Sequence, residues 1–393
     1  MVFPERFSNL PDYAFPRLRK LLDVHEAGGD PINMTIGEPR HPFPDWVAQT
    51  ITDHIEGFGR YPANDGTADL QTAIAGWVQR RYGVTIEAAA QVLPLNGTRE
   101  GLFNAALALC PEQKNGQKPA ILTPNPFYQV YAVAALAVGA EPIYVPATDE
   151  TGNLPDYASL PEDILNRVSI AYICSPANPQ GAVASRSYWQ DLITLAERYD
   201  FRIFADECYS EIYRDTPPVG ALEVAAEMGA DPDRVVIFHS LSKRSNLPGL
   251  RSGFAVSGKA NIAAMKQLRN YAGAPLPAPL QAVAARAWRD ETHVEVSRAL
   301  YQTKFRLADE IFGDVPGYHP PEAGFFLWLP VPDAEAAALK LWREVGVRVL
   351  PGHYLARDIN GITPGADRLR VALVAEQEEM QRGLILLRDC LYR

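Results

Sequence analysis

Residues 169–207 read SIAYICSPANPQGAVASRSYWQDLITLAERYDFRIFADE, and this stretch decides the fold class. Two short apolar runs, 169–174 and 202–207, flank a segment with helical periodicity at 187–199. Short buried strands that alternate with helices are typical of a mostly parallel sheet covered by helices on both faces. The stretch therefore predicts a strand–helix–strand unit of an α/β domain.

The same alternation extends from about residue 90 to about residue 260, with further strands expected at 119–123, 142–145, 234–240 and 253–258, and further helices at 98–110 and 127–139. A proline cluster at 273–283 fits a domain boundary. Beyond it the pattern is that of a smaller α+β unit, with strands expected at 324–330 and 368–374. A chain of 393 residues is too long for one ordinary core. We therefore predict a large domain over residues 46–280 and a small domain made of residues 1–45 and 281–393.

The composition excludes some classes of partner. The chain has 37 basic and 47 acidic residues and no long basic run, which argues against nucleic acid or an anionic membrane as the main partner. Its four cysteines form no CxxC pair and have no metal-like spacing with histidine, so we expect a reduced compartment and no metal. No apolar stretch approaches a membrane span, and residues 1–15 carry charges and prolines where a signal peptide would be apolar. These features predict a cytoplasmic protein.

Polar residues gather where the predicted strands end, which is where open α/β sheets bind ligands. Gly97 and Thr98 precede a helix, where free backbone N–H groups and a hydroxyl would suit an anion such as phosphate. The alternative is an ordinary helix cap by Thr98, with Arg99 solvated.

Asp206 ends an apolar strand, where a carboxylate requires a cationic partner. A protonated ring nitrogen of a ligand would serve, and so would Arg202 or Arg214. Tyr209, three residues later, either directs its phenol at the same ligand or is simply packed.

The turn SPANPQG at 175–181 places two X-Pro bonds around Asn178. A side-chain amide held still in such a turn suits ligand recognition, and it equally suits stabilisation of the turn itself.

Residues 240–254, SLSKRSNLPGLRSGF, place Lys243 after a strand, beside Ser240 and Ser242 and ahead of Arg251. Burial and a nearby cation lower the pKa of a lysine and make it a nucleophile toward carbonyl groups. Such a loop taken alone is equally compatible with a solvated surface. Together with the anion cradle, the aspartate and the fixed asparagine, it favours pyridoxal 5′-phosphate, which has an aldehyde, a phosphate, a ring nitrogen that must stay protonated and a ring phenolate.

The ordered motifs NGTR, NPFYQVY, NPQG, DECY, SLSK and GLR resemble those of the fold-type I, pyridoxal phosphate-dependent aminotransferases of class I/II, over essentially the whole chain. The resemblance implies that Lys243 binds the cofactor covalently and then moves a proton at the substrate Cα. It also implies that Asp206 pairs with the ring nitrogen and that Tyr209 and Asn178 hydrogen-bond the ring oxygen. The other cofactor-binding residues implied are Gly97, Thr98, Arg99, Ser240, Ser242 and Arg251 around the phosphate, and Tyr128 stacked on the ring.

The resemblance also implies substrate and subunit contacts. Arg370 corresponds to an arginine that binds the substrate α-carboxylate bidentately, and Gly37 to a backbone position beside that carboxylate. Arg368 shares the alternation of Arg370, so the choice between them rests on the resemblance. Tyr61 corresponds to a tyrosine that reaches the phosphate of a neighbouring subunit, which implies a homodimer with shared sites.

Three stretches are most similar to the N-succinyl-L,L-diaminopimelate aminotransferases of bacterial lysine synthesis: LNGTREGLF at 95–103, PNPFYQVY at 124–131 and SLSKRSNLPGLRSGF at 240–254. This similarity implies amino-group exchange between glutamate/2-oxoglutarate and N-succinyl-L,L-diaminopimelate/N-succinyl-2-amino-6-oxopimelate. Arg40 and His41 are candidates for binding the distal carboxylates of that substrate. The alternatives are an aminotransferase for aspartate, aromatic or other amino acids, a carbon–sulfur lyase, and a non-catalytic regulator that binds pyridoxal phosphate.

Overall fold

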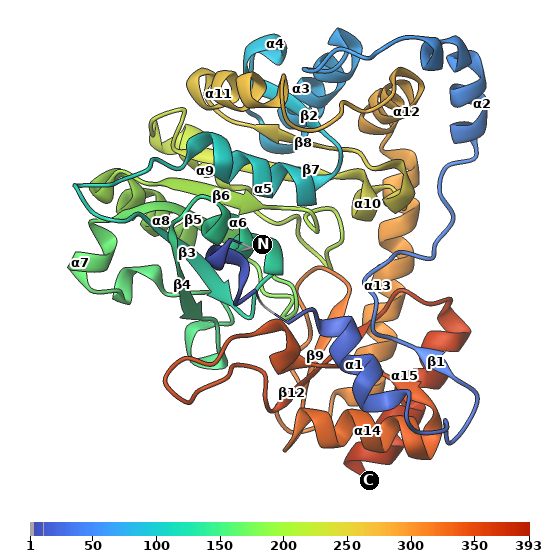
Figure 1. Ribbon diagram of the computed structural model, residues 1–393. Helices are drawn as coiled ribbons and strands as arrows, with labels where there is room; N and C mark the ends of the chain where they lie inside the picture. Colours follow the sequence, from blue (N-terminus) through green and yellow to red (C-terminus); the bar gives the residue numbers. More distant parts are fainter. Residues whose placement is uncertain (1–3, 11) are drawn as a thin grey trace.

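A seven-stranded sheet lies at the centre of the computed structural model, which describes residues 4–10 and 12–393; residues 1–3 and 11 of the N-terminal stretch discussed above lie outside the described residues. The strand order is β2-β8-β7-β6-β5-β3-β4 (Figure 1). β8 runs antiparallel to both its neighbours, β2 and β7, and the other neighbouring pairs of this sheet are parallel. This arrangement confirms the predicted mostly parallel sheet. The strands are β2 Val92–Leu95, β3 Ala120–Asn125, β4 Glu141–Pro146, β5 Val168–Cys174, β6 Arg202–Asp206, β7 Val235–Ser240 and β8 Gly253–Val256.

Helices cover both faces of this sheet because successive strand side chains point to opposite sides. Phe204 packs in the core on one face, whereas Ile203 and Ala205 pack in the core on the other. The first face carries α5 Thr98–Leu109, α6 Gln129–Ala137 and α11 Lys259–Arg269. The second carries α3 Ala68–Tyr82, α8 Arg186–Tyr199, α9 Ala221–Met228 and α12 Ala278–Arg289. Within residues 4–10 and 12–393, no helix combines the length and apolar character that a membrane span requires.

A smaller α+β unit lies below the large sheet in Figure 1 and confirms the second predicted architecture. Its antiparallel sheet has the order β11-β12-β9, and the short strands β1 and β10 form a separate parallel pair. The long helix α13 runs from the side of the large sheet down to this unit (Figure 1). The elements are α1 Ala14–Leu22, β1 Ile32–Asn33, α13 Thr292–Phe312, β9 Phe326–Pro330, α14 Ala334–Val345, β10 Val347–Arg348, β11 Leu350–Pro351, β12 Arg368–Ala372 and α15 Gln377–Tyr392.

The packing of α12 bears on where the two units divide. The predicted boundary at residue 280 falls inside this helix, and Val283, Ala284, Ala285, Ala287 and Trp288 contribute buried side chains to the core beside α3. The rings of Trp77 and Trp288, for example, lie 5.0 Å apart between centroids. The division of the chain into two domains stays a proposal, and this packing favours a boundary after Arg289.

The remaining α-helices are α2 Trp46–Asp53, α4 Ala88–Gln91, α7 Glu162–Leu165 and α10 Leu241–Arg244.

Candidate active site

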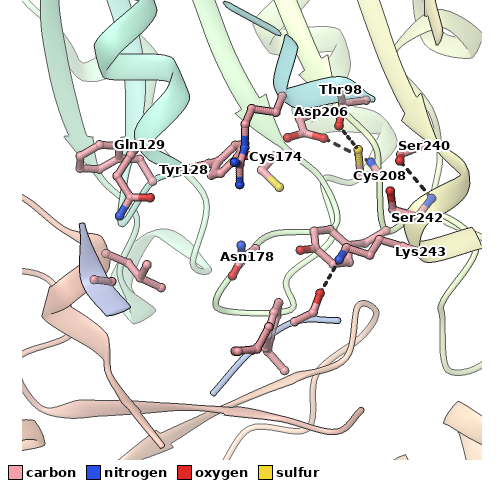
Figure 2. Close-up of a pocket in the computed structure, with 18 of the residues that line it drawn as sticks. Thr98, Tyr128, Gln129, Cys174, Asn178, Asp206, Cys208, Ser240, Ser242 and Lys243 are labelled. Atoms are coloured by element: carbon pink, nitrogen blue, oxygen red, sulfur yellow. Dashed lines mark hydrogen bonds between the residues drawn. The ribbon is translucent and has the colours of Figure 1, made fainter. Parts of the chain in front are cut away.

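A cavity of about 450 Å³ lies at the carboxyl ends of the parallel strands and is closed on its other side by residues of the smaller unit. It collects all the residues predicted to contact the cofactor or the substrate α-carboxylate except Gly97 and Tyr61, and it also leaves out the distal-carboxylate candidates Arg40 and His41. Figure 2 shows Thr98, Asp206 and Cys208 side by side, with Lys243 and Asn178 facing the same space. The predicted residues in the lining are Gly37, Thr98, Arg99, Tyr128, Asn178, Asp206, Tyr209, Ser240, Ser242, Lys243, Arg251 and Arg370.

Lys243 belongs to the short helix α10, which follows β7 directly. Its Nζ donates a hydrogen bond to the carbonyl oxygen of Gly37 and lies 5.4 Å from the centroid of the Phe325 ring. Burial lowers the pKa of Lys243 to about 8, and the charges of Arg370 and Arg251 act in the same direction. The amine therefore loses its proton more readily than an exposed lysine, as a nucleophile toward a carbonyl group requires.

Asp206 ends β6 and is only 5% exposed. Its Oδ2 accepts a hydrogen bond of 2.7 Å from the hydroxyl of Tyr131, and its Oδ1 accepts one of 3.4 Å from the backbone N–H of Cys208. Burial raises the pKa of Asp206, so a cation next to it would be strongly favoured.

Neither arginine that the sequence offered as a partner for Asp206 bonds to it. Arg202 donates to the side-chain oxygen of Asn261 at 2.8 Å. Arg214 forms an ion pair with Asp309. The structure therefore favours the other interpretation, in which a ligand supplies the cation.

The N-terminus of α5 forms the anion cradle. The N-cap residue is Gly97, with φ of +85°, and no side chain caps the helix, so Thr98 does not serve as the ordinary cap. A Cβ at Gly97 would lie 2.3 Å from Nη2 of Arg251 and would displace that guanidinium, and the positive φ also favours glycine. Nearby, the hydroxyl of Ser240 accepts a hydrogen bond of 3.1 Å from the backbone N–H of Ser242. Free helical N–H groups and an arginine suit a phosphate.

Arg370 projects from β12 into the cavity and is only 5% exposed. Its Nη1 donates to the side-chain oxygen of Asn178 at 3.0 Å, and its Nη2 donates to the carbonyl of Thr35 at 2.7 Å. The guanidinium lies 4.3 Å from the centroid of the Phe326 ring, and its buried Nε has no partner. Burial lowers the pKa of Arg370 to about 10. A carboxylate in the cavity would supply the compensating charge.

Asn178 and Tyr209 also line the cavity, and Asn178 is the residue whose side-chain oxygen accepts from Arg370. The Ser175–Pro176 and Asn178–Pro179 peptide bonds on either side of the amide are cis. The ring of Tyr209 packs edge-on against Phe325, with 5.3 Å between centroids, and burial raises the pKa of its phenol well above the usual value.

Arg368, Arg40 and His41 lie outside the cavity lining. Arg368 forms an ion pair of 2.6 Å with Asp149, so Arg370 is the arginine of this strand that reaches the cavity. Arg40 pairs with a carboxylate of α15 at 3.3 Å, and His41 is buried against the ring of Tyr301. The structure thus does not support Arg40 and His41 as ligands of a distal carboxylate.

Some lining residues were missed by the reasoning from sequence: Tyr131, Cys174, Cys208, Gln129 and residues 13–15 of the N-terminal segment. Tyr131 had a detectable signal, because it follows Tyr128 by three residues and therefore lies on the same side of α6. Residues 13–15 had none, because only the tertiary fold brings the start of α1 to this cavity.

The lining residues together fit pyridoxal 5′-phosphate. Lys243 offers an amine of lowered pKa for the aldehyde, and Asp206 is a buried carboxylate without an arginine partner. The cradle that a Cβ at Gly97 would fill suits the phosphate. This donor set matches the three reactive groups of the cofactor.

Comparisons with known proteins agree with this chemistry. Residues 29–385 match the family of class I and II aminotransferases. An LL-diaminopimelate aminotransferase of Dehalococcoides mccartyi is 31% identical over 98% of both chains. An aminotransferase structure from Neisseria meningitidis superposes with a TM-score of 0.94, 36% identity and full coverage of both chains. A probable N-succinyldiaminopimelate aminotransferase from Thermus thermophilus has a TM-score of 0.81 and 25% identity over 96% of this chain and all of that one. The chain therefore belongs to the class I and II aminotransferases, enzymes that use pyridoxal 5′-phosphate.

Proposed function

We propose that this aminotransferase exchanges an amino group between glutamate/2-oxoglutarate and N-succinyl-L,L-diaminopimelate/N-succinyl-2-amino-6-oxopimelate. The observation that carries the proposal is the convergence of Lys243, Asp206 and Arg370 on one cavity that holds a further arginine, Arg99. A substrate with several carboxylates complements this charge distribution.

The residues that line the cavity have distinct roles in this proposal. The bound cofactor acts as the electron sink. Lys243 holds the cofactor and then carries the proton at the substrate Cα, while Asp206 keeps the proton on the ring nitrogen. Asn178 and Tyr209 donate to the ring oxygen, and Arg370 binds and orients the α-carboxylate.

Arg99 supports a second carboxylate on the substrate. Its Nε donates to the hydroxyl of Tyr128 at 2.7 Å, and its Nη groups are further donors that a ligand can use. Lys243 and Arg251 are assigned to the cofactor and Arg370 to the α-carboxylate, so among the described lining residues Arg99 is the remaining cation. This interpretation moves Arg99 from the phosphate set, where the resemblance placed it, to the substrate.

Free L,L-diaminopimelate is a second candidate substrate. It is favoured by the relative from Dehalococcoides mccartyi, an LL-diaminopimelate aminotransferase. Its distal end carries an ammonium as well as a carboxylate, whereas the only carboxylate among the described lining residues is Asp206, already assigned to the cofactor. The charge of the lining thus favours the succinylated substrate.

The half-reaction of the holoenzyme tests this proposal. The enzyme is mixed separately with N-succinyl-L,L-diaminopimelate, L,L-diaminopimelate, glutamate, aspartate and phenylalanine, and loss of the visible absorbance of the bound cofactor is followed. We expect rapid loss with the succinylated compound and glutamate. Rapid loss with L,L-diaminopimelate instead would establish the second candidate. Rapid loss with aspartate or phenylalanine alone would refute both, and release of pyruvate and ammonia without an oxo-acid acceptor would indicate a lyase.

Arg99→Gln is expected to raise KM for N-succinyl-L,L-diaminopimelate by about 10- to 100-fold, because a hydrogen bond to a charged group contributes about 1.5–3 kcal/mol. Steady-state kinetics measures this change. Arg40→Gln is the matched control: its guanidinium pairs with Glu379 outside the cavity, so its KM should equal that of the wild type. Equal KM values for the two variants would remove Arg99 from substrate binding.

We further propose that the enzyme works as a cytoplasmic homodimer with shared sites. Tyr61 is fully exposed, and Ile55 and Phe58 just before it are each more than half exposed, which is typical of a surface that another subunit covers. Sedimentation analysis should give twice the mass of 43.3 kDa. A monomeric mass together with full activity would refute the shared site.

A further inference from the structure

A buried hydrogen-bonded cluster lies directly behind the cofactor-facing residues. The Tyr82 hydroxyl donates to Glu207 Oε2 at 2.6 Å and lies 3.2 Å from His239 Nε2, which is itself 3.1 Å from Glu207 Oε2. The other carboxylate oxygen, Oε1, accepts from the backbone N–H of Ala221 at 2.8 Å, and His239 Nδ1 lies 3.4 Å from the hydroxyl of Ser210. Tyr82, Glu207 and His239 are 5%, 2% and 2% exposed. None of the three lines the cavity.

The cluster is joined to the site by the two central strands. Glu207 follows Asp206 at the end of β6, and His239 precedes Ser240 at the end of β7. Asp206 and Ser240 line the cavity, whereas Glu207 and His239 point to the opposite side, as alternation along a strand requires. The backbone N–H of Glu207 donates to the carbonyl of Phe238 at 3.0 Å, which pairs the two strand ends.

Burying these polar side chains costs desolvation free energy, so core packing by itself does not explain why they are there. The ring of His239 lies 4.8 Å from that of Trp77 and 5.2 Å from that of Phe254, in an otherwise apolar core. Apolar side chains of similar volume generally stabilise such a site at least as well as buried polar groups. Directional hydrogen bonds, by contrast, fix the angle and register of the elements they join, here α3, β6, β7 and the start of α9.

We propose that Tyr82, Glu207 and His239 are positioning residues for transamination. They hold the end of β6 against the end of β7, and so fix the carboxylate of Asp206 and the segment 240–243 that carries Lys243 relative to one cofactor. Small displacements of reacting groups cost large factors in rate, so a loosened cluster should impair chemistry more than binding. The inference rests on the chemistry of the family and not on the proposed substrate.

The test is Glu207→Gln in the holoenzyme, assayed with whichever amino acid the wild type converts. We expect kcat to fall by about 10- to 100-fold, with KM changed by no more than about threefold. The pH midpoint of the bound cofactor's visible absorbance should also shift, because it reports how Asp206 and Lys243 are placed. A residue that only stabilised the fold would lower Tm and leave this midpoint in place.

Glu211→Gln is the matched control. Glu211 is also buried, at 5% exposure, and is ion-paired with Arg81 at 2.7 Å and Arg298 at 2.8 Å, but neither of its chain neighbours, Ser210 and Ile212, is among the described residues that line the cavity. It should lower Tm and leave kcat and the absorbance midpoint unchanged. Tyr82→Phe removes a single hydroxyl and decides the question if Glu207→Gln does not fold. Wild-type kcat and midpoint in the folded Glu207 or Tyr82 variant would overturn the proposal.

Discussion

Replacement of Lys243 by alanine is expected to abolish transamination, with a decrease in kcat of about 10⁴-fold or more, because one residue supplies both the covalent anchor and the proton-transfer group. Its amine has a pKa lowered to about 8 by burial and projects into the cavity. The variant should bind the cofactor without a covalent bond. Visible absorbance, mass spectrometry after borohydride reduction and steady-state rates measure these effects.

Lys304 provides the matched control for this prediction. Burial lowers its pKa to about 8 as well, and its Nζ donates to the carbonyl of Ala375 at 2.6 Å, outside the cavity lining. Lys304→Met should reduce stability and retain the covalently bound cofactor. The assignment of Lys243 would be wrong if its alanine variant kept the cofactor bond while the Lys304 variant lost it.

Asp206→Asn is expected to lower kcat by about 10²- to 10⁴-fold. Removing one partner of a buried charge pair costs about 3–5 kcal/mol, and each 1.36 kcal/mol in the barrier is a factor of ten. A neutral amide cannot stabilise a proton on the ring nitrogen, so the cofactor loses its capacity as an electron sink. Single-turnover loss of visible absorbance measures the chemical step directly.

Tyr131→Phe is the graded comparison for Asp206. It removes the hydrogen bond of 2.7 Å to Oδ2 but keeps the carboxylate, so the decrease in kcat should be much smaller than for Asp206→Asn. Equal rates for the Asp206 variant and the wild type would contradict the pairing of this carboxylate with the cofactor.

Most of the large sheet could be predicted from sequence because most of its strands are buried and appear as continuous apolar runs, but β2, Val92–Leu95, was not among the expected strands. The run at 169–174, for instance, became β5, Val168–Cys174. The pair β1 and β10 could not be predicted, since each strand has only two residues and no periodicity can be detected over that length. The position of α12 was equally hidden, because its apolar stripe does not reveal which core it joins.

The candidate site could be predicted wherever its residues end a strand or begin a helix, as Asp206 and Gly97 do. Contacts between segments that are distant in the sequence could not be predicted. The bond from Tyr131 to Asp206 joins residues on α6 and β6, and the choice of Arg370 over Arg368 depended on which side chain the surface carboxylate of Asp149 captures. These outcomes are set by tertiary packing and not by local pattern.

The bond between Arg370 and the carbonyl of Thr35 joins residues 335 positions apart in the chain. A contact of such long range requires closure of a long loop, which costs conformational entropy. On the ribosome, every strand of the large sheet emerges before Arg370 does. A chain that ends before Arg370 would therefore include every strand of the large sheet but lack the arginine proposed to bind the substrate α-carboxylate, so the proposed carboxylate recognition requires synthesis of nearly the whole polypeptide.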